Sequence, residues 1–246
     1  MSSRTPTFRW WSASASDSGH VRDHNEDAWL DDAANGLWAV ADGMGGHSRG
    51  EVASQCVIES LQQIGRHPSI AGAVREAQVR LLGANQHLRA LTGGDPHTII
   101  GATAAVLITA HNSCACVWAG DSRIYRLRGG DLAQLTQDHS ETSYLVQRGE
   151  ISAEEAETHP DANVLTRAVG GADELDVDTQ FYDLADGDRF LICSDGLYRE
   201  MNASEIATYL RMGSVAQACH FLLRLALSRE CSDNVTAVVV EFIRAA

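Results

Sequence analysis

Four aspartates stand at the ends of apolar runs, and this feature constrains the fold of the chain most strongly. Residues 37–41 (LWAVA) stop at Asp42, the run RFLICS stops at Asp195, SCACVWAG leads into Asp121, and Asp233 precedes VTAVVVEF. Runs this apolar predict buried strands that deliver carboxylates to one edge of a core. Such carboxylates are costly unless cations offset them, and oxygen donors suit Mg²⁺ or Mn²⁺. Each Asp-Gly pair taken alone is more typical of a turn, and the sequence does not show that the four positions meet.

A charged segment, RDHNED, covers residues 22–27. The planar guanidinium of Arg22 suits bidentate binding of a phosphate group. Glu26 and Asp27 would then support metal ions or metal-bound waters. The alternative interpretation is a charged loop that only contacts solvent.

Strand and helix patterns come in blocks, which favours an α+β fold with antiparallel sheets. Turn signals at 111–112, 120–121 and 129–130 predict that the four strands between 103 and 135 form a meander of hairpins. Residues 138–161 are polar and predict a mobile surface insertion with one short helix, opened by a capping box at Ser152. Predicted strands cover 8–16, 28–30, 37–41, 103–109, 113–119, 123–127, 131–135, 177–182, 189–193 and 234–242; predicted helices cover 51–64, 70–91, 203–210 and 215–227. Without a linker or repeat, we expect a single domain over residues 1–246.

Composition limits the partners and the location of the protein. The formal net charge is −14, with 33 acidic residues against 19 basic ones, and every basic residue is Arg. Such an acidic surface disfavours nucleic acid and anionic membranes as partners. Six cysteines without a CxxC or metal-binding spacing predict reduced, buried thiols, with Cys114 and Cys116 on one face of a strand. No signal peptide or membrane span is indicated, so we expect a cytoplasmic protein.

The ordered motifs resemble the metal-dependent Ser/Thr protein phosphatases of the type 2C (PPM) family, in their compact bacterial form. They span residues 19 to 240, so the resemblance covers nearly the whole chain. The motifs are GHVRDHNEDA (19–28), VADGMGGHSRGEVAS (40–54), GATAAV (101–106), AGDSRIYRLRGGDLAQLTQDHS (119–140), LTRAVG (165–170), FLICSDGLY (190–198) and DNVTAVVV (233–240).

The resemblance implies a four-layer αββα sandwich, in which helix pairs flank two antiparallel sheets and a metal site lies at one end. Asp42 matches the carboxylate that bridges two Mn²⁺ or Mg²⁺ ions, and Gly43 matches the residue whose carbonyl binds one of them. Asp195 and Asp233 match the remaining carboxylate ligands. Asp121, together with Asp195, matches a third and weaker metal position.

The resemblance also implies the reaction and the partners. A hydroxide bridging the two ions would attack the phosphorus of phosphoserine or phosphothreonine in line, with Arg22 on the phosphate and no covalent phosphoenzyme. Residues 139–161 match the flap beside the active site. Expected partners are phosphorylated proteins of a cognate bacterial Ser/Thr kinase, and a link to type VI secretion is a further hypothesis. A monomer is expected.

The proton donor for the leaving group is not assigned by the sequence. Met44 stands where larger eukaryotic relatives have a His. His47 is expected on the first turn of the following helix, and His139 is expected to be structural. Two alternatives stay open: a catalytically weak phosphatase-fold module that binds partners, and a phosphatase of small molecules.

Overall fold

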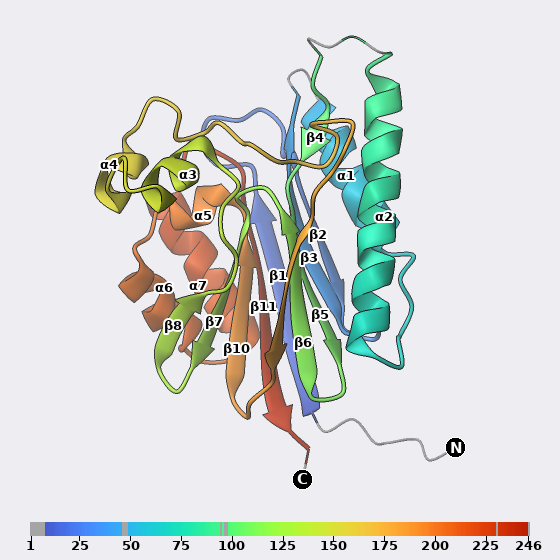
Figure 1. The fold of residues 1–246 in the computed structure, drawn as a ribbon. Coiled ribbons are helices and arrows are strands. Elements are labelled where there is room, and N and C mark those ends of the chain that lie inside the picture. The colour runs from blue at the N-terminus through green and yellow to red at the C-terminus, as the bar shows by residue number, and fades with distance from the viewer. Residues whose placement is uncertain (1–7, 46–48, 94, 96–97, 230, 246) are drawn as a thin grey trace.

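Two antiparallel sheets pack face to face and carry helices on both outer faces (Figure 1). The computed structural model describes residues 8–45, 49–93, 95, 98–229 and 231–245. The strands are β1 (Phe8–Asp17), β2 (Asp27–Asp32), β3 (Leu37–Met44), β4 (Gly101–Ala102), β5 (Ala104–Ala110), β6 (Ser113–Ala119), β7 (Arg123–Arg128), β8 (Asp131–Gln134), β9 (Asp178–Asp183), β10 (Asp188–Cys193) and β11 (Val235–Arg244). The helices are α1 (Arg49–Leu61), α2 (Ile70–Leu91), α3 (Glu141–Gln147), α4 (Ala153–Glu157), α5 (Asp195–Tyr198), α6 (Ala203–Leu210) and α7 (Val215–Ser228).

The two sheets have the strand orders β1-β11-β10-β7-β8 and β2-β3-β5-β6-β9, with β4 beside β3 in the second. Helices α1 and α2 cover the outer face of the second sheet, and α5, α6 and α7 cover the first (Figure 1). The four-layer α+β sandwich expected from the sequence is therefore confirmed.

Strand β11 shows why some runs are apolar throughout. Val238, Val240 and Phe242 face the opposite sheet, whereas the alternating Ala237 and Val239 face the helices. A strand covered on both faces has no side that can be polar, so its sequence loses the alternation of a half-exposed strand. Cys114 and Cys116 both lie between the sheets, as predicted. All six cysteines are free thiols, but only five are buried, because Cys56 is half-buried.

The predicted meander of four strands is wrong at its centre. Strands β5 and β6 form one hairpin and β7 and β8 another, but β6 pairs with β9 while β7 pairs with β10. The chain crosses between the sheets at Gly120 and Asp121. Gly120 adopts φ +109° against the side chain of Thr103, where a Cβ would lie 2.6 Å from the methyl group. This close contact needs glycine and directs the chain into the other sheet instead of a tight hairpin.

The polar segment after β8 contains more structure than the sequence predicted. The capping box between Ser152 and Glu155 is present at α4, but α3 precedes it with Ser140 as its N-cap. Helix α5 was also not predicted. Helices of four to seven residues are too short to show an amphipathic period, so their patterns resemble loops. His47 lies outside the described residues.

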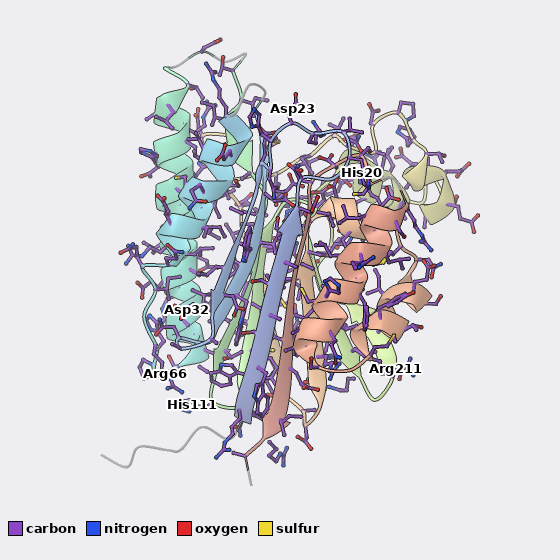
Figure 2. All side chains as sticks on the ribbon, turned by 180° about the vertical axis from the view of Figure 1, so that it is seen from behind. His20, Asp23, Asp32, Arg66, His111 and Arg211 are labelled. Carbon is purple, nitrogen blue, oxygen red and sulfur yellow. The ribbon has the colours of Figure 1, made fainter. Side chains whose placement is uncertain are left out.

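No described helix is both long and apolar enough to cross a membrane. The loop that carries His20 and Asp23 lies at one end of the sandwich, and His111 lies at the opposite end (Figure 2).

Replacing Phe242 by Ala should destabilise the sandwich strongly. Its ring is fully buried and packs 5.6–5.9 Å from the rings of Trp10, Trp38 and Phe190, measured between centroids. Loss of such a ring leaves a cavity and typically costs about 3–5 kcal/mol of unfolding free energy. Phe181→Ala is the control, because that ring is 48% exposed on β9. Equal unfolding midpoints in urea for the two variants would contradict this account of the core.

Candidate metal centre

The four aspartates meet at one end of the sandwich, which the sequence alone did not show. Asp42 lies near the end of β3, Asp121 in the crossing after β6, Asp195 at the start of α5, and Asp233 just before β11. All four line one cavity of about 300 Å³. The other lining residues are Arg22, Glu26, Gly43, Met44, Gly45, Thr103, Asn163, Leu165, Arg199 and Asn234.

Gly43 lets three parts of the chain meet beside Asp42. A Cβ on Gly43 would lie 2.1 Å from the carbonyl oxygen of Gly50 at the start of α1 and 2.6 Å from that of Glu26. No side chain fits at these distances. Any larger residue here would push the start of α1 away from the cavity.

The carboxylates in and behind the cavity are poorly solvated. Burial raises the pKa of Asp42 well above its usual value, and the nearby charges of Asp27 and Asp195 raise it further. Burial, together with Asp195, raises the pKa of Asp121 to about 7. The pKa of Asp195 is also raised, again mainly by burial. A cation close to these acids would lower the free-energy cost of ionising each of them.

The donor atoms fit hard divalent cations. Oδ1 of Asp195 and Oδ1 of Asp27 are buried and have no hydrogen-bond partner, which is costly for a carboxylate. The acidic side chains and backbone carbonyls that line the cavity offer only oxygen, the ligand type that Mg²⁺ and Mn²⁺ prefer. Among the described residues, however, no three acidic, His or Cys side chains form a ready ligand set for one ion. The metal-ligand roles of Asp42, Gly43, Asp195, Asp233 and Asp121 stay predictions.

Two arginines hold the carboxylates at the cavity edge. Arg22 Nη2 lies 2.9 Å from Oδ2 of Asp233, and Arg199 Nε lies 2.9 Å from Oδ2 of Asp195. Neither ion pair was predicted. The Arg22 side chain is 53% exposed, so it reaches the cavity from its rim. Its role in binding phosphate stays a prediction.

Glu26 and Asp27 lie at different depths. Glu26 lines the cavity, and its backbone N–H donates to Oδ1 of Asn234 at 2.7 Å. Asp27 is buried behind the cavity, opposite Asp42 in the β2–β3 register, and accepts a hydrogen bond of 2.7 Å from Ser194 Oγ. Burial raises its pKa to about 7. This position suits the supporting role predicted for Asp27, away from direct contact with a ligand in the cavity.

Several residues that shape the site were not singled out from the sequence. Thr103 Oγ1 accepts the backbone N–H of Asp42 at 2.9 Å. Asn234 donates through Nδ2 to the carbonyls of Ser18 and His24, each at 3.0 Å, and so fixes the loop before β2. Both residues lie inside the motifs GATAAV and DNVTAVVV, so their place in the family motifs could have identified them as site residues. Arg199 lies just after the motif FLICSDGLY, and no sequence pattern marked it as a site residue.

His139 supports the start of the flap, residues 139–161. Its Nδ1 accepts the N–H of Gly120 at 3.1 Å, so its Nε2 carries the hydrogen donated to Asp178 Oδ2, also at 3.1 Å. Burial lowers its pKa, which favours this neutral form. The ring stacks on Trp118 and does not line the cavity. These contacts agree with the structural role expected for His139.

Comparison with protein families gives one match over most of the chain. The model described as "Protein phosphatase 2C" matches residues 15–230. The Ser/Thr protein phosphatase PstP of Mycobacterium tuberculosis is 37% identical over 232 residues, which are 94% of this chain. They are only 45% of PstP, so the chain spans about half the length of that relative.

Solved structures with the same fold include two that bear on the site. PppA, titled a key regulatory component of T6SS in Pseudomonas aeruginosa, has a TM-score of 0.88 and 38% identity, with 95% of this chain and 98% of PppA covered. The catalytic domain of PstP in complex with two manganese ions has a TM-score of 0.87 and 35% identity, with 96% of this chain and all of that chain covered.

Asp42→Asn should stabilise the protein without divalent ions and remove the stabilisation that Mn²⁺ provides. Folding raises the pKa of the Asp42 carboxyl group above its unfolded-state value of about 3.8. The contribution of this group to the free energy of unfolding is therefore fully present below that value and is lost as the pH rises through the folded-state pKa. Asn mimics the protonated form, so its advantage in chelator should grow from pH 5 to pH 8. Mn²⁺ should raise the melting temperature of the wild type but not that of Asp42→Asn.

The matched control is Asp131→Asn, an exposed acid at the start of β8. It should follow the wild type under every condition. A melting temperature of Asp42→Asn that rises with Mn²⁺ as much as that of the wild type would contradict the metal centre.

Proposed function

Since the chain belongs to the protein phosphatase 2C family, we propose that it is a metal-dependent phosphatase of phosphoserine and phosphothreonine in proteins. The observation that carries the proposal is the convergence of four aspartates and two arginines on one cavity. We further propose that residues 1–246 form one phosphatase domain whose flap is residues 139–161. The related PstP catalytic domain binds two manganese ions, which supports the same chemistry here.

In this proposal the aspartates hold the ions. Asp42, the carbonyl of Gly43, Asp195 and Asp233 would hold two Mn²⁺ or Mg²⁺ ions, and Asp121 with Asp195 would hold a third. When bound, such ions lower the pKa of a coordinated water so that hydroxide is available near neutral pH as the nucleophile. Asp27 and Thr103 would keep the strand end that carries Asp42 in place.

Arg22 would bind the phosphate group. Its guanidinium already lies at the cavity rim, paired with Asp233. A phosphate dianion offers the planar donor fork two oxygens and a larger charge than one carboxylate. We expect Arg22 to exchange part of its contact with Asp233 for the substrate and to offset charge on the phosphoryl oxygens during the reaction.

The lining of the cavity supports a phosphorylated side chain rather than a nucleotide as substrate. None of the described lining residues is aromatic, so no ring is present on which a base could stack. Met44 lines the cavity but has no proton to give, so the leaving-group acid remains unassigned. A small-molecule phosphatase and a non-catalytic binding module are the two alternatives, and the experiment below separates them.

The biological partners are part of the proposal. The similarity to PppA supports a role in type VI secretion, and the similarity to PstP supports a role opposite a bacterial Ser/Thr kinase. A cytoplasmic location and a monomeric state stay predictions.

The proposed function is tested by phosphate release from matched phosphoserine, phosphothreonine and phosphotyrosine peptides, with Mn²⁺ and with excess chelator. Release should depend on Mn²⁺ and favour phosphoserine and phosphothreonine. Asp42→Asn should lower kcat by roughly 100-fold or more, the scale of losing a transition-state electrostatic contact, and Asp131→Asn should not. Release from sugar phosphates or nucleotides alone would favour the small-molecule enzyme. No release from any compound with Mn²⁺ bound would favour the binding module.

Arg22→Ala should mainly raise KM for the phosphopeptide, because a phosphate contact is lost while the source of hydroxide remains. We expect an increase of about tenfold, the usual scale of one charge-assisted hydrogen bond. Arg211→Ala is the control, since Arg211 is exposed after α6, does not line the cavity, and lies away from the loop of His20 and Asp23 (Figure 2). Steady-state kinetics that give the wild-type KM for Arg22→Ala would remove Arg22 from the phosphate site.

A further inference from the structure

Arg199 joins two carboxylates of the cavity to the flap side of the site. Its Nε donates to Oδ2 of Asp195 at 2.9 Å, and its Nη2 lies 3.9 Å from Oδ2 of Asp121. Its Nη1 donates to Oδ1 of Asn163, which follows α4. We call this set of contacts the Arg199 bridge. One guanidinium therefore contacts both acids that match the third metal position and also the segment beyond the flap.

Asp121, one of the two acids in the Arg199 bridge, is held in place by neighbouring side chains. Tyr198 Oη donates to Oδ2 of Asp121 at 3.3 Å, and the guanidinium of Arg123 lies 3.6 Å from the centre of the Tyr198 ring. Arg123 is itself held by three hydrogen bonds to the carboxylate of Asp138. The Asp121 side chain is only 8% exposed, whereas that of Arg199 is 36% exposed. Arg199 is therefore the more solvated partner, and the one that loses less contact with the protein if the pair separates.

On the flap side, the segment that carries Asn163 makes few other contacts with the rest of the protein. Leu165 pairs with Ser140, and the carbonyl of Val164 accepts the N–H of Glu141 at 2.9 Å. Val164 itself is 47% exposed. Loss of the hydrogen bond from Arg199 would leave this segment attached through backbone contacts to the start of α3.

We propose that Arg199 is an internal cation that competes with the third, weaker divalent ion for Asp121 and Asp195, and that this ion displaces Arg199 and frees Asn163. The proposal rests on the proposed function, because it assigns that third position to a metal. A guanidinium stays protonated at any physiological pH, so it must move away when a divalent ion takes Oδ2 of Asp195. Binding of the weak ion is thereby coupled to the order of the flap.

The first test measures Mn²⁺ binding by calorimetry to the full chain, stripped with chelator, at pH 8. In Arg199→Gln, the weakest binding event should tighten about tenfold, a usual size for coupled binding, because the competing charge is gone. Arg211→Gln is the control and should bind like the wild type. An unchanged or weakened last event in Arg199→Gln, or no third event in either protein, would overturn the proposal.

The second test measures amide hydrogen exchange of residues 140–165 as Mn²⁺ is added. In the wild type, exchange should increase over the concentration range of the weakest event. In Asn163→Ala, it should be high without metal and respond little to Mn²⁺. Equal exchange in the two proteins at all Mn²⁺ concentrations would contradict the coupling. Neither readout needs turnover, so a chain without phosphatase activity can still pass both tests, and an active phosphatase can fail them.

Discussion

The burial of several carboxylates at one end of the β-sandwich is the constraint on which the rest of the structure depends. The acids have different partners: Asp195 pairs with Arg199, Asp27 accepts a hydrogen bond from the hydroxyl of Ser194, and the more exposed Asp233 pairs with Arg22. These contacts lower the cost of burial but leave carboxylate oxygens without partners. A divalent cation that reached those oxygens would offset this cost, and its binding would then be coupled to folding.

The site forms only when both sheets are in place. Asp42 comes from the six-stranded sheet, whereas Asp195 and Asp233 flank β10 and β11 of the five-stranded sheet. The aromatic core between the sheets, with Trp38 and Phe242 in edge-to-face contact, holds together the two sheets that carry these acids. Side chains at strand ends are held more rigidly than side chains in long loops, which suits a site that must bring like charges together.

Local patterns in the sequence predicted the helices and strands well. They did not predict contacts between residues that are far apart in the sequence. Helix α2 was predicted at its observed bounds because Ser69 caps its start and its apolar period is regular. The crossing at Gly120 was mistaken for a hairpin, since a glycine turn serves both connections and only the pairing of β6 with β9 distinguishes them. The pair of Arg22 and Asp233 joins residues 211 positions apart, and no local pattern reports such a contact.

The ion pairs of this protein differ in exposure according to where they lie. Asp188 pairs with Arg128 and is fully buried, accepting two hydrogen bonds from that guanidinium. Removing Arg128 would leave the buried carboxylate of Asp188 without its compensating charge. The acids at the cavity keep some contact with solvent: the side chain of Asp195 is 14% exposed and that of Asp233 is 40% exposed. In the proposed function, Arg22 and Arg199 would neutralise these acids before ions or phosphate bind and would then move away, whereas Arg128 could not leave Asp188 without leaving a fully buried charge unpaired.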